Sequence, residues 1–167
     1  TIVNNNDLTK LKIEAQNDLT LNVSIELGDI LITEETPLNQ SEKSFVRLNL
    51  PGFHKSLEVG LPELPEVHRL IEIPADANPV VNITNSEFVE ISLNDYNVSY
   101  PVLPSQEPIS KSQSIESINF KMNDTIYKKD KYILNDEIVT IEDQGILRSV
   151  RVGNIIVKPV NYNPIKN

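Results

Sequence analysis

Residues 19–27 read Leu-Thr-Leu-Asn-Val-Ser-Ile-Glu-Leu, with an apolar side chain at every second position. Successive side chains of an extended chain point to opposite faces, so this alternation predicts a half-buried β-strand. Residues 11–15 alternate in the same way just before it. A Gly-Asp turn signal at 28–29 and a new apolar run at 30–32 then predict a hairpin between 19–27 and the strand that follows.

The rest of the chain continues this pattern of short, β-branched or alternating runs. No stretch of ten or more residues has the 3.6-residue apolar period of a helix. Further strands are predicted at 45–50, 70–73, 80–84, 88–93, 138–141, 146–152 and 155–160. The pattern therefore predicts an all-β protein, an antiparallel β-sandwich or jelly-roll-like barrel with little helix. A length of 167 residues suits one domain covering residues 1–167.

Two segments interrupt the strand pattern. Residues 60–65 read Gly-Leu-Pro-Glu-Leu-Pro and are expected to run extended into the strand at Leu70, because proline restricts its own backbone and that of its neighbour. Residues 100–136 form a long polar stretch without clear periodicity. Irregular connections of this length are uncommon in a compact domain and are usually functional or disordered.

Composition excludes several classes of partner. The net charge of -9 argues against nucleic acid, whose phosphates require clustered Lys and Arg. The chain has no cysteine, so it contains neither a disulfide framework nor a thiol nucleophile. No apolar run has the length of a membrane span.

Catalytic motifs are equally scarce. His54 and His68 lie in no HExxH pattern and beside no plausible nucleophile, so both are interpreted as structural or exposed histidines. Carboxylate pairs such as Glu142-Asp143 lack the spacing of a calcium loop and are interpreted as solvated surface charge. No phosphate-binding glycine loop is present. The sequence predicts a module that is not an enzyme and holds neither cofactor nor metal.

Several segments, in the same order and with similar spacing, resemble the N-terminal propeptide of gingipain-like cysteine peptidases, peptidase family C25. The Gly-x-Pro-x-Leu-Pro motif and its following strand correspond to residues 60–73, and 81–90 is similar to a family strand that ends Ser-x-Phe-Ile/Val-Glu. Residues 137–140 precede the most specific block. In that block, 146–151 (Ile-Leu-Arg-Ser-Val-Arg) and 158–164, with its Tyr-Asn-Pro, resemble the family's Ile-Leu-Arg-Asp-Val-Arg strand and Pro-x-x-Tyr-Asn-Pro turn.

This resemblance implies an inhibitory prodomain that keeps a secreted bacterial cysteine peptidase latent as a zymogen and assists its folding. Its partner would be the catalytic domain of its own C25-type peptidase, and the precursor would be exported through the periplasm to the cell surface or medium. The family's inhibitory loop places a basic residue in the S1 pocket of the peptidase. Aligned here, that loop falls on Ile109, Ser110, Lys111 and Ser112, with Lys111 as the residue that enters the pocket.

The resemblance also implies that residues 1–167 lack the final strand of the prodomain or the linker to a downstream peptidase domain. Two other functions remain open from the residues alone. One is a β-sandwich adhesion or carbohydrate-binding module of a cell-surface protein. The other is a Ca²⁺-dependent hydrolase without a recognisable motif.

Overall fold

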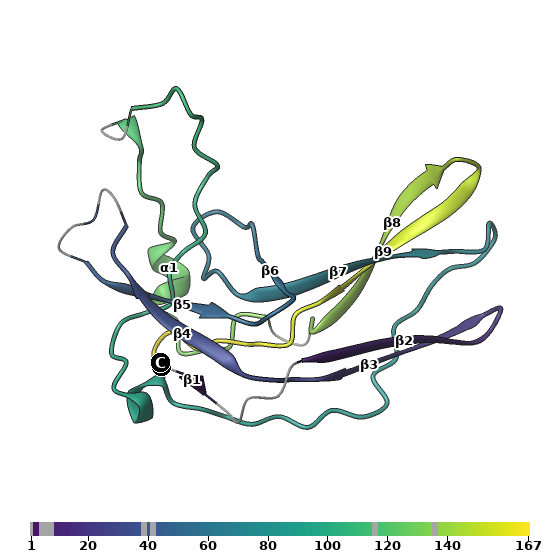
Figure 1. Cartoon of the computed structure of the whole chain (residues 1–167), viewed down its shortest axis with the longest axis horizontal. Coiled ribbons are helices and arrows are strands. Elements are labelled where there is room, and N and C mark those ends of the chain that lie inside the picture. The colour runs from purple at the N-terminus through teal and green to yellow at the C-terminus, as the bar shows by residue number, and fades with distance from the viewer. Residues whose placement is uncertain (1, 4–8, 38–39, 41–42, 115–116, 135–136) are drawn as a thin grey trace.

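The computed structural model describes residues 2–3, 9–37, 40, 43–114, 117–134 and 137–167. Strands dominate it, and each of its two helical elements is a single turn, the 3-10 helix η1 (Leu93–Tyr96) and the α-helix α1 (Asp124–Tyr127). The all-β, mainly antiparallel fold is confirmed. The described strands form three sheets and do not close into a barrel (Figure 1).

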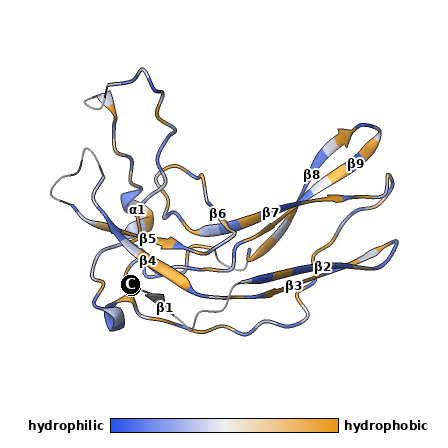
Figure 2. Ribbon diagram, viewed as in Figure 1, coloured by the Kyte–Doolittle hydropathy of each residue, from blue (hydrophilic) through white to orange (hydrophobic). Residues whose placement is uncertain are grey.

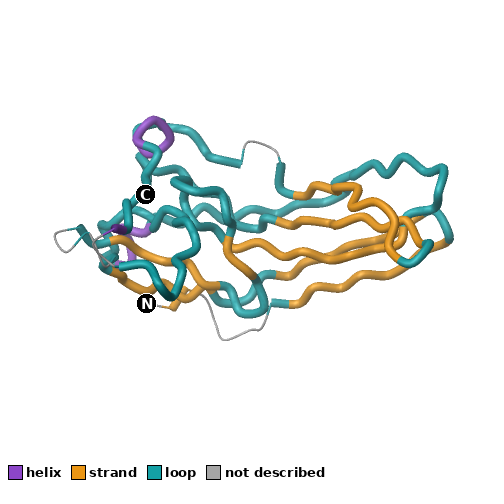
Figure 3. The backbone as a smooth tube through the Cα atoms, turned by 90° about the horizontal axis from the view of Figure 1, so that it is seen from above, coloured by secondary structure: helices purple, strands orange, loops and turns teal. Residues whose placement is uncertain are grey.

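The three sheets share no strand. One has the order β1-β4-β5, the second is the β2-β3 pair, and the third has the order β6-β7-β9-β8. The strands span β1 Ile2–Val3, β2 Lys10–Asn17, β3 Thr20–Glu26, β4 Ile30–Glu35, β5 Phe45–Asn49, β6 His54–Lys55, β7 Pro65–Glu72, β8 Val139–Leu147 and β9 Val150–Val157. Seen from above, the strands follow the long axis and both ends of the chain lie at the same end of the molecule (Figure 3).

The strand expected at 19–27 is present as β3, but its predicted hairpin partner is wrong. β3 pairs antiparallel with β2, and β4 pairs with β1 and β5 instead. Gly28 is buried, and its N–H donates to Thr9 Oγ1 at 2.8 Å. The Gly-Asp signal therefore marks where the chain passes from one sheet to the next, since a tight turn between paired strands would not bury it in this way.

The hydrophobic core lies where the β4-β5 sheet meets the irregular segments. Ile32, Val46 and Leu48 pack with residues contributed by the turns and loops, namely Leu64, Leu93, Val98, Val102 and Tyr162. A smaller cluster joins β7 and β9 through Val67, Ile155 and Val157. Residues of the irregular segments are therefore packed into the same core as residues of the strands.

The β8-β9 hairpin differs in its boundaries from the expected strands. The strand predicted at 146–152 contains the hairpin turn itself, at Arg148 (φ 50°) and Ser149 (φ 69°). A two-residue turn with both φ angles positive is usually Asn-Gly or a similar pair, so Arg-Ser gave no turn signal. Apolar residues gather at the tip of this hairpin, where Ile146 and Leu147 are exposed (Figure 2).

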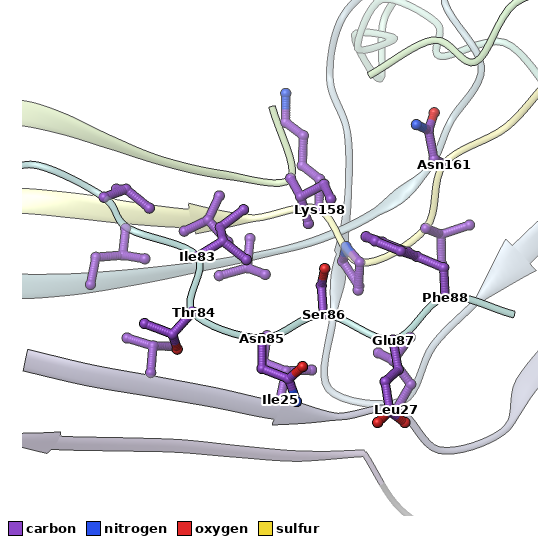
Figure 4. A pocket seen from close by; sticks show the side chains of 18 of the residues that line it. Ile25, Leu27, Ile83, Thr84, Asn85, Ser86, Glu87, Phe88, Lys158 and Asn161 are labelled. Carbon is purple, nitrogen blue, oxygen red and sulfur yellow. The ribbon is translucent and has the colours of Figure 1, made fainter. Parts of the chain in front are cut away.

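The strands predicted at 80–84 and 88–93 are wrong. Residues 78–91, which we call the strap, are extended and exposed but pair with no described strand, and 93 begins η1. In Figure 1 the strap descends from the end of β7 past the β2-β3 pair and continues below that pair to η1, and in Figure 4 it passes close to the strand that carries Ile25 and Leu27. An extended segment can carry the same alternating sequence pattern as a strand without having a paired neighbour.

No helix within the described ranges is both long and apolar enough to cross a membrane.

Candidate functional site

The most prominent irregular feature is a projecting loop, described over residues 106–114 and 117–122, which stands away from the strand layers above β5 and α1 (Figure 1). It lies within the stretch 100–136 that the sequence marked as irregular. Its tip carries the four residues that the resemblance assigned to inhibition.

The base of the loop is a buried, hydrogen-bonded segment at 102–105. Val46 N donates to Pro101 O at 2.9 Å and Leu103 N donates to Val46 O at 2.7 Å, which joins the segment to β5. On its other side, Glu63 N donates to Leu103 O at 2.8 Å. The proline-rich segment at 60–65 therefore serves as a second neighbour for the loop base, a role that its extended backbone allows.

Two buried tyrosines fix the main chain of Val102. Tyr127 Oη donates to Val102 O at 2.7 Å, and Val102 N donates to Tyr162 Oη at 3.3 Å. Tyr162 Oη in turn donates to Asn167 Oδ1 at 2.7 Å. Burial raises the pKa of Tyr162 to about 12 and the pKa of Tyr127 further, so both hydroxyls keep their protons above the pH at which an exposed tyrosine ionises.

The neck of the loop is closed by one glutamine side chain. Gln106 Nε2 donates to Lys121 O at 2.8 Å, and Lys121 N donates to Gln106 Oε1 at 2.9 Å. The side chain thus forms the two-bond pattern of a strand pair and brings the outgoing and returning arms together. The Lys121 ammonium also pairs with the Glu107 carboxylate across the neck.

The returning arm ends in a capped helical turn. Asn123 N donates to Gly60 O at 2.9 Å, and Asn123 Oδ1 accepts from Thr125 N at 3.1 Å and Ile126 N at 3.2 Å, as an N-cap does. Gly60 has φ +84°, a conformation that favours glycine, and a Cβ there would lie 3.4 Å from Asn123 N. The glycine of the Gly-x-Pro-x-Leu-Pro motif therefore supports the foot of the loop.

The tip is a turn with an exposed lysine. Gln113 N donates to Ser110 O at 3.0 Å, and the hydroxyls of Ser110 and Ser112 lie 3.1 Å apart, on either side of Lys111. Ile109 is half exposed at 50%. The structure thus brings all four predicted residues, Ile109, Ser110, Lys111 and Ser112, to one solvent-facing turn.

Lys111 differs from most lysines of the chain in having no acidic partner. It makes no hydrogen bond or ion pair with any residue that the structure describes, whereas Lys10, Lys12, Lys55, Lys121, Lys158 and Lys166 each lie within 4 Å of a carboxylate. Its charge is therefore available to a partner. The exposed Lys128 and Lys129 also lack such a contact among the described residues, but they lie beside α1 at the foot of the loop.

A charged network supports the loop base from below. Glu63 Oε1 lies 2.9 Å from Arg47 Nε and 3.1 Å from Lys55 Nζ, and Arg47 Nη1 lies 2.8 Å from Glu35 Oε2. The side chain of Glu63 is only 12% exposed. Two cations thus converge on one nearly buried carboxylate, which gives this network more influence on stability than an exposed pair has.

We expect Glu63→Ala to lower the free energy of unfolding by about 1–3 kcal/mol, because it leaves the partly buried Arg47 without its inner partner. The urea midpoint of unfolding measures this change. Glu107→Ala is the matched control, since it removes one carboxylate from an exposed pair that is worth about 0–1 kcal/mol. Equal midpoints for the two variants would contradict the role given to the network.

The two histidines occupy ordinary structural positions. His68 Nε2 lies 2.9 Å from Glu66 Oε1, and its Nδ1 lies 3.0 Å from Asn154 Nδ2. His54 is exposed on β6. Among the described residues, no three His, Asp or Glu side chains converge as a metal site would require.

Several residues of this loop were not found by sequence reasoning. No sequence motif marks Gln106, which closes the neck, because its partner is the main chain of a distant residue. No sequence motif marks Phe120 either, whose ring centroid lies 5.3 Å from that of Phe45. Asn123 does lie in a recognisable motif, since Asn followed by Asp and Thr is a typical helix start.

Comparison with known proteins adds sequence relatives to this geometry. A family model described as Propeptide_C25 matches residues 23–167. A Lys-gingipain of Porphyromonas gingivalis is 33% identical over 134 residues, which cover 80% of this chain and 8% of the relative. Gingipain R1 of the same organism is 25% identical over 154 residues, or 92% of this chain and 8% of the relative. The chain thus spans less than a tenth of the length of these curated relatives.

Two solved structures resemble the whole fold. One concerns the zymogenic latency of gingipain K from P. gingivalis and superposes with a TM-score of 0.83 at 26% identity, covering 100% of this chain and 90% of that one. The other is a complex of the pro- and mature domains of RgpB from P. gingivalis, with a TM-score of 0.75 at 22% identity, covering 93% of this chain and 76% of that one. At that lower identity the second likeness concerns the fold alone.

Proposed function

The chain belongs to the propeptide family of C25 peptidases, a non-catalytic region of a peptidase precursor, and we propose that it keeps its own gingipain-type catalytic domain latent and assists that domain's folding. The observation that carries this proposal is the likeness over the full chain to a structure that concerns zymogenic latency, with a TM-score of 0.83. The partner is then the catalytic domain of the same precursor.

The finer part of the proposal concerns the tip of the projecting loop. Lys111 enters the S1 pocket of the peptidase, and Ile109, Ser110 and Ser112 line the approach. Three observations support this assignment: the loop projects from a rigid, hydrogen-bonded base, Lys111 has no partner among the described residues, and its flanking residues face solvent.

The chemistry of such a pocket is defined by the lysine. A site that accepts Lys or Arg requires a carboxylate at its base, and a lysine delivered there forms a desolvated, hydrogen-bonded ion pair. The exposed ammonium of Lys111 reaches the pocket without first breaking an internal salt bridge. A tip held by the Ser110–Gln113 turn also loses less conformational entropy on docking than a free peptide would.

We expect the isolated chain to inhibit the separated C25 catalytic domain in trans. Titration of the catalytic domain with the chain, read out by hydrolysis of a peptide with a basic P1 residue, measures the affinity. A cysteine peptidase that cuts after apolar residues serves as the control and is expected to retain its activity. Full activity of the C25 domain in the presence of excess folded chain would contradict the proposal.

We also propose that residues 1–167 act as one prodomain and that the precursor is exported through the periplasm to the cell surface or the medium. The match of the family over 23–167 and the gingipain relatives support this assignment over an adhesion module or a calcium-dependent hydrolase. Cell fractionation tests it, and a precursor confined to the cytoplasm would contradict it.

A further inference from the structure

The strap is the longest stretch of unpaired backbone that is exposed at every residue. All residues from 78 to 91 are exposed, and from 78 to 91 no main-chain group bonds to any described residue. Figure 4 shows the strap passing between the layer that carries Ile25 and Leu27 and the layer that leads to Lys158. Ile83 and Ser86 point to one side of the strap in this view, and Asn85 and Glu87 point to the other.

Among the described residues, the hydrogen bonds and ion pairs that hold the strap lie near its two ends. At the start, Arg151 Nη1 donates to Ala77 O at 2.7 Å and to Ala75 O at 3.0 Å. At the other end, the Glu90 carboxylate accepts from Tyr132 Oη at 2.7 Å and lies 3.3 Å from Lys166 Nζ. Residues 78–89 between these anchors make no hydrogen bond or ion pair with the described part of the chain. Their apolar side chains are exposed to solvent as well: Phe88 is 70% exposed and Val89 is 83% exposed.

Such a segment has the properties that endopeptidases require of a substrate. A protease cleft binds several residues of extended chain, and main-chain groups that already belong to a sheet must first be freed by local unfolding. The strap is extended and exposed, and its main chain bonds to none of the described residues, so no described contact has to be broken first. It also has ends that remain anchored, so the chain on both sides of a cut keeps its place in the sheets.

The composition of the strap restricts which peptidases can use it. Between Arg69 and Lys111 the sequence contains no Lys and no Arg. A peptidase that requires a basic P1 residue therefore finds no bond to cut there, whereas the strap offers Val80, Val81, Ile83, Phe88, Val89 and Ile91 to enzymes that cut beside apolar residues.

We propose that the strap is a proteolytic cleavage site of this domain, open to endopeptidases that cut beside apolar residues and closed to peptidases of Lys or Arg specificity. The reaction is simple hydrolysis: water adds its oxygen to the carbonyl carbon, the C–N bond breaks, and the leaving nitrogen takes up the proton. No further reactant is required. Where the proposed function holds, the same composition protects the strap from the basic-specific peptidase that the domain restrains, while a second peptidase is able to cut it.

The first experiment places a basic residue in the strap and uses trypsin as the probe. Asn85→Lys introduces a trypsin site into the strap, and Asn22→Lys introduces the same change at an exposed asparagine of β3 that pairs with Glu14 of β2. Mass spectrometry of a time course measures the rate at each new site. We expect the Asn85→Lys site to be cut at least about tenfold faster, because the β3 site requires opening of the hairpin.

The second experiment tests the native sequence with thermolysin, which cuts before apolar residues. We expect cuts within 78–91 to precede any cut within a paired strand. Ser86→Lys repeats the trypsin test at the neighbouring residue if Asn85→Lys lowers the unfolding midpoint. The proposal is overturned if the strap lysine is cut no faster than the β3 lysine, or if thermolysin cuts paired strands while the strap stays intact. Neither probe involves the C25 peptidase, so these results are independent of the proposed inhibition.

Discussion

Replacement of Lys111 by alanine is expected to weaken inhibition of the C25 catalytic domain by about 2–5 kcal/mol, which corresponds to roughly 30-fold to several thousand-fold in the inhibition constant. The loss is large because the variant leaves a carboxylate of the pocket buried without a cation. Folding should hardly change, since an exposed loop substitution alters stability by about 0.5 kcal/mol or less. The measurement is titration of the catalytic domain with each variant, accompanied by urea unfolding.

The foot of the same loop supplies matched controls for this effect. Lys128→Ala and Lys129→Ala remove the same charge from exposed positions beside α1. If attraction between the acidic and basic surfaces were the whole effect, these variants would weaken inhibition as Lys111→Ala does. We expect small losses that shrink further with added salt, because exposed charges are screened within about 10 Å at 0.1 M salt.

A conservative replacement tests the shape of the pocket. Lys111→Arg keeps the charge but replaces a compact ammonium with a planar guanidinium, so we expect it to retain part of the inhibition. The titrations are carried out at low and at high salt. If the Lys111→Ala variant inhibits as tightly as the parent under both conditions, the assignment of Lys111 is wrong. Inhibition would then depend on surface contacts outside the tip.

The strands that the sequence predicted correctly are those whose pattern is local. Alternation at 11–15 and 19–27 identified β2 and β3, and the apolar run at 45–50 identified β5. The run predicted at 155–160 coincides with β9 only over residues 155–157. Which strands pair with each other was harder to predict from the sequence, because pairing depends on strand edges that only the complete fold brings together. The strand at 19–27 was assigned to the wrong neighbour for this reason.

The errors at the strap and at the β8-β9 turn have separate physical causes. Residues 80–84 and 88–93 have the composition of strands, but a strand also requires a neighbouring edge, and none of the described strands pairs with them. Arg148 and Ser149 adopt positive φ angles without the glycine or asparagine that normally marks such a turn. In both cases the tertiary structure overrides a local preference.

The candidate site could be predicted only in part. An irregular stretch at 100–136 was visible because it lacks any periodicity, and the tip at 109–112 came from the resemblance alone. The parts that make the loop rigid join distant residues, such as Gly60 to Asn123 and Val102 to Tyr162. No single-sequence pattern records contacts of this kind, so the support of the loop emerges only from the structure.

Phe45 packs beside the base of the projecting loop. We expect Phe45→Ala to lower the free energy of unfolding by about 3–5 kcal/mol. Phe45 begins β5 and is only 2% exposed, so its removal loses apolar burial and leaves a cavity. Its ring also contacts Phe120 on the returning arm of the projecting loop. The next residue, Val46, bonds to the main chain on both sides of Val102, so the loss occurs directly beside the loop base.

Phe88→Ala is the matched control for this substitution, because it removes the same side chain from a position that is 70% exposed, where the change should be about 0.5 kcal/mol or less. Urea unfolding of the parent and both variants measures the difference through the midpoint at constant slope. Phe120→Ala, which removes only the half-buried partner ring, is expected to fall between them. If Phe45→Ala costs no more than Phe88→Ala, the β5 contact is not what holds the loop base, and the core must tolerate the cavity by collapsing around it.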